Sequence, residues 1–124
     1  MLGTRNAVAN LAVKDIGRAR AFFTDTLGLK QVGSEGDELI VLKSGDSVVN
    51  VYRSEFAGTN EATAVTWEVD DIEAEVESLK GKGVAFEHYD MPGFEREGDL
   101  YVGDGMKIAW FKDPDGNILN IVGE

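Results

Sequence analysis

The stretch Ala9-Asn10-Leu11-Ala12-Val13-Lys14-Asp15-Ile16 recurs in outline further along the chain as Val65-Thr66-Trp67-Glu68-Val69-Asp70-Asp71-Ile72. Both place a valine, then an aspartate, then an isoleucine, at a constant offset of 56 residues (71 − 15). Each begins with alternating residues, which indicate a strand, and reaches an aspartate suited to cap a helix. A repeat of this length predicts two copies of one supersecondary unit, and we expect a ligand at the interface between the copies.

The two halves also end alike, because residues 45–51 (Gly-Asp-Ser-Val-Val-Asn-Val) resemble residues 115–121 (Asp-Gly-Asn-Ile-Leu-Asn-Ile). The offset there is 70 (120 − 50), so the second half has gained about fourteen residues (70 − 56) in between. With 124 residues, we expect a single domain. Its first module covers about 1–56, a linker 57–61 and a second module about 62–124.

The residue pattern of each copy predicts one strand, then a helix, then three further strands. In the first copy the helix runs from its cap at Asp15 to Gly28, and the strands cover 7–13, 30–33, 38–42 and 47–53. In the second copy the helix follows Asp71 and ends near Gly81 and Gly83. Its strands are predicted at 64–69, 84–88, 106–111 and 117–122, and residues 89–105 are predicted to form a loop or hairpin.

The distribution of charge limits the class of partner. The net charge is −11, with seven basic and seven acidic residues in 1–60 but five and sixteen in 61–124. Nucleic acid is excluded as a partner, because its binding depends on neutralising phosphates. The acidic half favours a cationic small molecule, or it serves only as a solubilising surface. The chain has no cysteine, no apolar run of membrane-spanning length and no signal-peptide core, so we expect no membrane association and a cytoplasmic location.

A family resemblance follows from three motifs. They are Val-x-Asp-Ile at 13–16, Phe-Phe at 22–23 with Leu-Gly-Leu at 27–29, and Phe-Lys-Asp-Pro-Asp-Gly-Asn at 111–117. Over nearly its whole length the chain resembles the vicinal oxygen chelate superfamily, which includes glyoxalase, bleomycin-resistance proteins and extradiol dioxygenases. The resemblance implies an α+β fold in which two βαβββ modules form a curled mixed sheet around a central cavity. It also implies pairing of modules, so we expect a homodimer.

Enzymes of this superfamily usually hold a divalent metal with one ligand from each of four strands. Carried over to this chain, the resemblance places those ligands at Val8, Asn50, Ala64 and Asn120. Valine and alanine cannot coordinate, and an asparagine carbonyl is a weak ligand compared with carboxylate or imidazole. We therefore expect that the chain binds no metal and no cofactor, and we assign no catalytic residue.

Strand alternation identifies candidate residues for binding a small molecule. If alternate side chains face the predicted cavity, it is lined by Asn10, Asn50, Tyr52, Thr66, Glu68, Trp110 and Asn120, while Phe111 packs under a helix. Phe94 and Tyr101 are further aromatic candidates. Each aromatic residue is equally compatible with core packing, Glu68 with a solvated strand end, and the two asparagines with a mutual hydrogen bond. His88 is the only histidine, and one imidazole alone makes a poor metal site.

Three functions remain open from the sequence. The first is a metal-free protein that binds or sequesters a small, cationic or aromatic molecule, as bleomycin-resistance proteins do. The alternative is a lyase or dioxygenase-type enzyme with an atypical metal site or none, using Glu68 or His88. The third is a structural or stress-associated dimer without a specific ligand.

Overall fold

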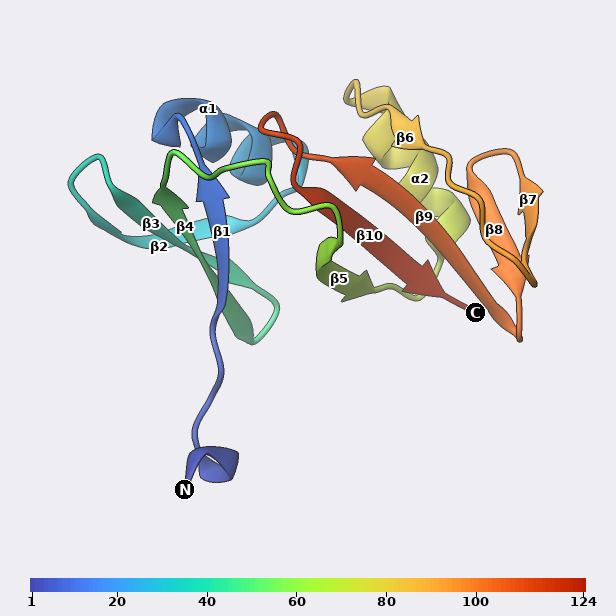
Figure 1. Ribbon diagram of the computed structural model, residues 1–124, viewed down its shortest axis with the longest axis horizontal. Coiled ribbons are helices and arrows are strands. Elements are labelled where there is room, and N and C mark those ends of the chain that lie inside the picture. The colour runs from blue at the N-terminus through green and yellow to red at the C-terminus, as the bar shows by residue number, and fades with distance from the viewer. The chain divides into compact units, whose positions relative to one another are not determined.

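Two units of the chain, Met1–Thr59 and Asn60–Glu124, each build a sheet of their own in the computed structural model, which describes residues 1–124 (Figure 1). Both units combine a helix with a mixed sheet, so the predicted α+β class with two related βαβββ modules is confirmed. The assignment of both modules to one domain and the cavity between them stay predictions. No helix is long and apolar enough to cross a membrane.

The first unit follows the predicted order of elements closely. Its elements are η1 (Leu2–Thr4), β1 (Ala9–Val13), α1 (Ile16–Arg20), the π-helical η2 (Ala21–Thr26), β2 (Lys30–Glu35), β3 (Leu39–Ser44) and β4 (Ser47–Arg53). The sheet order is β1-β4-β3-β2, in which β1 and β4 are parallel and the other pairs are antiparallel. The four predicted strands of this half are therefore all present, with ends shifted by a few residues.

The first helix begins and ends where the sequence predicts. Asp15 accepts a hydrogen bond from the Arg18 amide at 3.0 Å, and Gly28 ends the helical segment at φ 82°. The π-helical part was not expected. There the Thr24 hydroxyl donates to the Arg20 carbonyl at 2.7 Å, and the Leu27 amide reaches back to Phe22. A side-chain donor at that carbonyl competes with the regular helical hydrogen bond, which accounts for the local widening.

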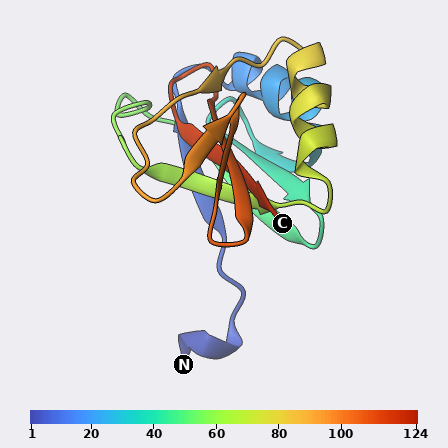
Figure 2. The ribbon, with the colours of Figure 1, turned by 90° about the vertical axis from the view of Figure 1, so that its right-hand side faces the viewer.

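The second unit has the same plan with extra strands. Its elements are β5 (Thr63–Glu68), α2 (Ile72–Gly81), β6 (Phe86–Glu87), β7 (Glu95–Glu97), β8 (Leu100–Gly103), β9 (Met106–Lys112) and β10 (Ile118–Gly123). The sheet order is β5-β10-β9-β8-β7, and β6 pairs only with β9. Figures 1 and 2 show α2 along one face of this sheet. Asp71 caps α2 by accepting from the Ala74 amide at 3.1 Å.

One predicted strand of the second unit is shorter than the sequence predicts. Of residues 84–88, predicted to form the strand after the helix, only Phe86 and Glu87 pair with β9, as β6. Comparison of the two sheets shows that β6 and β8 together take the place that β2 has in the first unit, because both pair with β9 as β2 pairs with β3. The residues gained by the second half therefore lie between β6 and β8 and include β7. The predicted hairpin within 89–105 is present as β7–β8, with Gly98 at φ 65° in its turn.

Strand register decides which residues of the second sheet lie under α2. A Cβ on Gly123 would lie 3.3 Å from Ile72 of α2, so the residues of β10 that share its face point toward the helix. Leu119 belongs to that set and pairs with Phe111 on β9. Phe111 is 1% exposed and stacks on Trp67 at a centroid distance of 6.4 Å. Phe111 thus packs on the helix side, as the alternation predicts.

The turn between β9 and β10 is built around a buried carboxylate. Asp113 accepts hydrogen bonds from the amides of Asn117 (2.8 Å) and Asp115 (3.0 Å), and from the Asn117 side-chain amide (2.7 Å). Gly116 supplies the positive φ of 89° that the turn requires. Burial raises the pKa of Asp113, and the hydrogen bonds from Asn117 and Asp115 oppose that rise only in part.

Truncation of Phe111 tests the packing under α2. Phe111→Ala is expected to lower the free energy of unfolding by about 3–5 kcal/mol, because a buried ring is lost and a cavity remains. Phe56→Ala is the matched control, since Phe56 is 69% exposed, and we expect a change within about 0.5 kcal/mol. Urea denaturation followed by circular dichroism measures both. Equal effects of the two changes would show that the register is wrong.

Asp113 gives a prediction about pH. Its pKa is raised above the ordinary value of 3.8, so the folded protein binds this proton more tightly than the unfolded chain does. This group therefore favours folding below pH 3.8, and the contribution is lost as pH rises through the folded-state pKa. The unfolding free energy of the wild type, minus that of Asp113→Asn, should fall as pH rises from 3 to about 7. A difference that rises with pH would contradict the raised pKa.

Candidate functional site

The seven predicted binding residues divide between the two sheets. Asn10, Asn50 and Tyr52 lie on β1 and β4, in alternation with the buried residues of those strands, and Asn10 is the register partner of Asn50. Asn10 donates to the Val8 carbonyl at 3.3 Å, and Tyr52 is exposed. These three side chains therefore share the solvent-accessible side of the first sheet.

The other four predicted residues share the side of the second sheet that faces away from α2, which we call the far face. Asn120 is flanked by its register partners Thr66 on β5 and Trp110 on β9, while Glu68 lies two residues beyond Thr66. Asn120 is 7% exposed, and its side-chain oxygen is buried without a hydrogen-bond partner. A buried acceptor without a donor costs about 1–3 kcal/mol, so this oxygen is suited to a donor on a bound molecule.

The environment of Trp110 differs from the expected pocket lining. Trp110 lies on the far face, but it is only 8% exposed. Its ring makes edge-to-face contacts with Tyr89 (centroids 5.7 Å apart) and Tyr101 (5.3 Å apart), and its indole N–H donates to the Thr63 hydroxyl at 3.1 Å. The chain itself therefore covers the ring, and the role of Trp110 in binding a ligand stays a prediction. Sequence patterns missed Tyr89, which lies in a segment with no strand or helix period.

A cavity of about 590 Å³ lies at the end of the far face. Glu68, Met106 and Val122 line it from strands β5, β9 and β10. Its remaining wall comes from Gly123 of β10 and from neighbouring segments that include the acidic residues Asp70 and Asp104. Apolar side chains beside several carboxylates make a site that attracts cations and can also cover an apolar part of a ligand.

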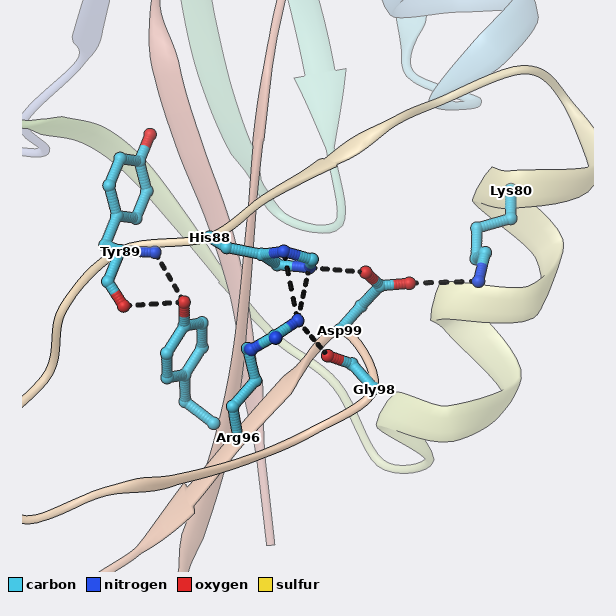
Figure 3. Close-up of polar contacts among 7 residues, drawn as sticks. Lys80, His88, Tyr89, Arg96, Gly98 and Asp99 are labelled. Atoms are coloured by element: carbon cyan, nitrogen blue, oxygen red, sulfur yellow. Dashed lines mark hydrogen bonds and ion pairs between the residues drawn. The ribbon is translucent and has the colours of Figure 1, made fainter.

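His88 belongs to a polar network in the second unit, shown in Figure 3. Its Nε2 lies 2.8 Å from one oxygen of Asp99, whose other oxygen is 2.9 Å from the Lys80 ammonium. The hydrogen bond from His88, followed by that from Lys80, lowers the pKa of Asp99. Arg96 Nη1 lies 3.0 Å and 3.3 Å from the two ring nitrogens of His88. One atom this close to both nitrogens lies over the face of the ring.

This network fastens the hairpin of β7 and β8. Arg96 also donates to the Gly98 carbonyl at 3.2 Å, so the β7–β8 turn is tied both to the end of β6 and, through Asp99, to the last turns of α2. No hydroxyl nucleophile takes part in it. The sequence suggested His88 as a ligand or base, whereas the structure shows its Nε2 engaged with Asp99.

The four positions that the resemblance assigns to a metal carry side chains that are poor metal ligands. Val8 and Ala64 bring hydrocarbon, and Asn50 and Asn120 bring neutral amides. No group of three or more His, Cys, Asp or Glu side chains that could hold a metal is found. These residues do not fit a transition metal of the kind that prefers imidazole, thiolate or carboxylate ligands.

Comparisons with known proteins show the class of fold and the family to which the chain belongs. The fold is that of solved structures in the glyoxalase group, and the Glyoxalase/Bleomycin resistance protein/Dioxygenase superfamily matches residues 5–121. The chain belongs to this superfamily. A search among curated proteins finds no match.

Three solved structures illustrate the similarity of fold. Lactoylglutathione lyase from Agrobacterium tumefaciens has a TM-score of 0.71 and 17% identity, covering 97% of this chain and 93% of that one. TnmS3, an antibiotic-binding protein from Streptomyces sp. CB03234, has a TM-score of 0.69 and 18% identity, covering 99% and 98%. A glyoxalase/bleomycin resistance protein from the same Streptomyces has a TM-score of 0.62 and 20% identity, covering 94% and 97%.

Removal of the shared carboxylate tests the fastening role of the network. Asp99→Asn is expected to cost up to about 1 kcal/mol, because His88 and Lys80 lose their charged acceptor. Hydrogen exchange should become faster in the amides of residues 95–103 and remain unchanged in β10. Glu95→Gln removes the same charge from the same hairpin and should leave exchange unaltered. Equal exchange in both variants would exclude the fastening role.

Proposed function

We propose that this protein binds a small aromatic cation on the far face of the second sheet and does so without a metal. The observation that carries the proposal is the cavity that Glu68, Met106 and Val122 line at the end of that face. It combines a carboxylate with apolar surface, which is what an organic cation requires. The homodimer and the cytoplasmic location expected from the sequence remain parts of this proposal.

Long-range electrostatics support a cationic ligand. The whole net charge of −11 arises in residues 61–124, where sixteen acidic residues outweigh five basic ones. The cavity lies in this acidic half, so its potential raises the local concentration of cations and repels anions. The antibiotic-binding neighbour with the same fold is consistent with a sequestering role, although an 18% identity supports only the fold.

The binding experiment uses proflavine, a flat aromatic cation with N–H donors, and acridine-9-carboxylate as an anion of similar ring size. Calorimetric titration is carried out in the presence of EDTA. We expect proflavine to bind and the anion not to bind. Glu68→Gln should weaken proflavine binding roughly fivefold, since one partly exposed charge pair contributes on the order of 1 kcal/mol.

Glu75→Gln is the matched control, because Glu75 is an exposed carboxylate in the first turns of α2 and does not line the cavity. Its affinity for proflavine should equal that of the wild type. Failure of the wild type to bind proflavine, or equal weakening by the two substitutions, would refute the proposal. Binding that disappears with EDTA would refute the metal-free part of it.

A further inference from the structure

The segment 89–94 lies across the far face of the second unit. Met91 and Phe94 pack against the cluster of Tyr101, Ile108 and Trp110. The close approach of the segment explains a glycine in β8, because a Cβ on Gly103 would lie 2.8 Å from the carbonyl oxygen of Gly93 and 2.9 Å from the ring of Phe94. The segment is thus fitted to the sheet at its Phe94 end.

At the other end the backbone is held independently of the Tyr89 side chain. The Tyr101 hydroxyl donates to the Tyr89 carbonyl at 2.7 Å and accepts from the Tyr89 amide (Figure 3). This single hydroxyl therefore fixes both backbone groups of residue 89. A rotation of the Tyr89 side chain breaks neither of these hydrogen bonds.

The Tyr89 ring itself is held weakly. Residue Tyr89 is 37% exposed, and its ring contact is the perpendicular one with Trp110. An edge-to-face aromatic pair contributes modestly beyond burial, so a ligand that makes a better contact with the indole can replace it. The register partner of Trp110 is Asn120, whose buried oxygen lacks a donor.

We propose that the Tyr89 ring occupies a subsite on Trp110 that receives the flat aromatic ring of the ligand, and that the ligand enters by displacing this side chain. The inference rests on the proposed function and specifies its ligand class as a planar aromatic compound with an N–H or O–H donor for Asn120. The insert that carries Tyr89 has no counterpart in the first unit, so the subsite belongs to the second unit alone.

The first test fills the space that truncation of Tyr89 leaves. In a Trp67→Phe background Trp110 is the only tryptophan, and its emission reports on the subsite. We expect p-cresol, which has the side chain of tyrosine, to change this emission and to raise the melting temperature of Tyr89→Ala. Tyr89→Phe keeps a ring in place and serves as the matched control, in which p-cresol should have neither effect.

The possible outcomes of this test are decisive. A folded Tyr89→Ala protein that does not respond to p-cresol, or a Tyr89→Phe protein that responds equally, overturns the inference. Should Tyr89→Ala fail to fold, Tyr89→Leu replaces it with the same expectations, because leucine keeps apolar contact with the cluster but leaves the indole without an aromatic partner.

The second test uses proflavine and separates this inference from the proposed function. Tyr89→Ala should bind proflavine about two- to tenfold more tightly than Tyr89→Phe, because the bound state no longer displaces a ring. Equal or weaker binding overturns the inference even when the wild type binds proflavine. When no variant binds proflavine, the proposed function fails, and the p-cresol result alone decides whether the subsite accepts a free aromatic ring.

Discussion

The register between β9 and β10 controls both sides of the second sheet. Phe111 opposite Leu119 faces α2, while Trp110 opposite Asn120 faces away from it. Because side chains alternate with a period of two, a slip of one residue would pair Phe111 with Asn120 and place both on one face. Either the amide would then be buried under the helix or Phe111 would be turned outward. The core and the candidate site are therefore set by the same pairing, and neither can be changed alone.

The Asp113 turn is what fixes this register. Its carboxylate accepts three hydrogen bonds from the two residues that lead into β10, and the Asp113 amide donates to the Asn117 carbonyl at 3.1 Å. The turn therefore has one length and one shape, and it leads directly into the first pair of the ladder, Lys112 with Ile118. A buried charge is tolerated there because several donors surround it.

Local patterns predicted the regular parts of this fold. The alternation in residues 47–53 matches β4, and the capping aspartates at 15 and 71 both begin helices, since these signals act within a few residues. The strand predicted at residues 84–88 is reduced to Phe86 and Glu87, because the whole segment has strand composition whereas the extent of its pairing depends on β9. The Tyr89 ring contacts Trp110, which lies 21 positions further along the chain (110 − 89). A contact between such distant residues produces no periodic pattern in the sequence.

The two copies diverge at the position where we propose the binding site. In the first sheet Asn50 has Asn10 and Val41 as its register partners, and in the second sheet Asn120 has Thr66 and Trp110. The amide is kept in both rows, but only the second row has an indole beside it. The insert with Tyr89 and the excess of negative charge are found in that same half.

An aromatic surface needs a cover when no ligand is present, because an exposed indole promotes association with other apolar surfaces. The valine of the first row has less apolar surface to cover, and the first unit accordingly has no segment in the place of the one that carries Tyr89.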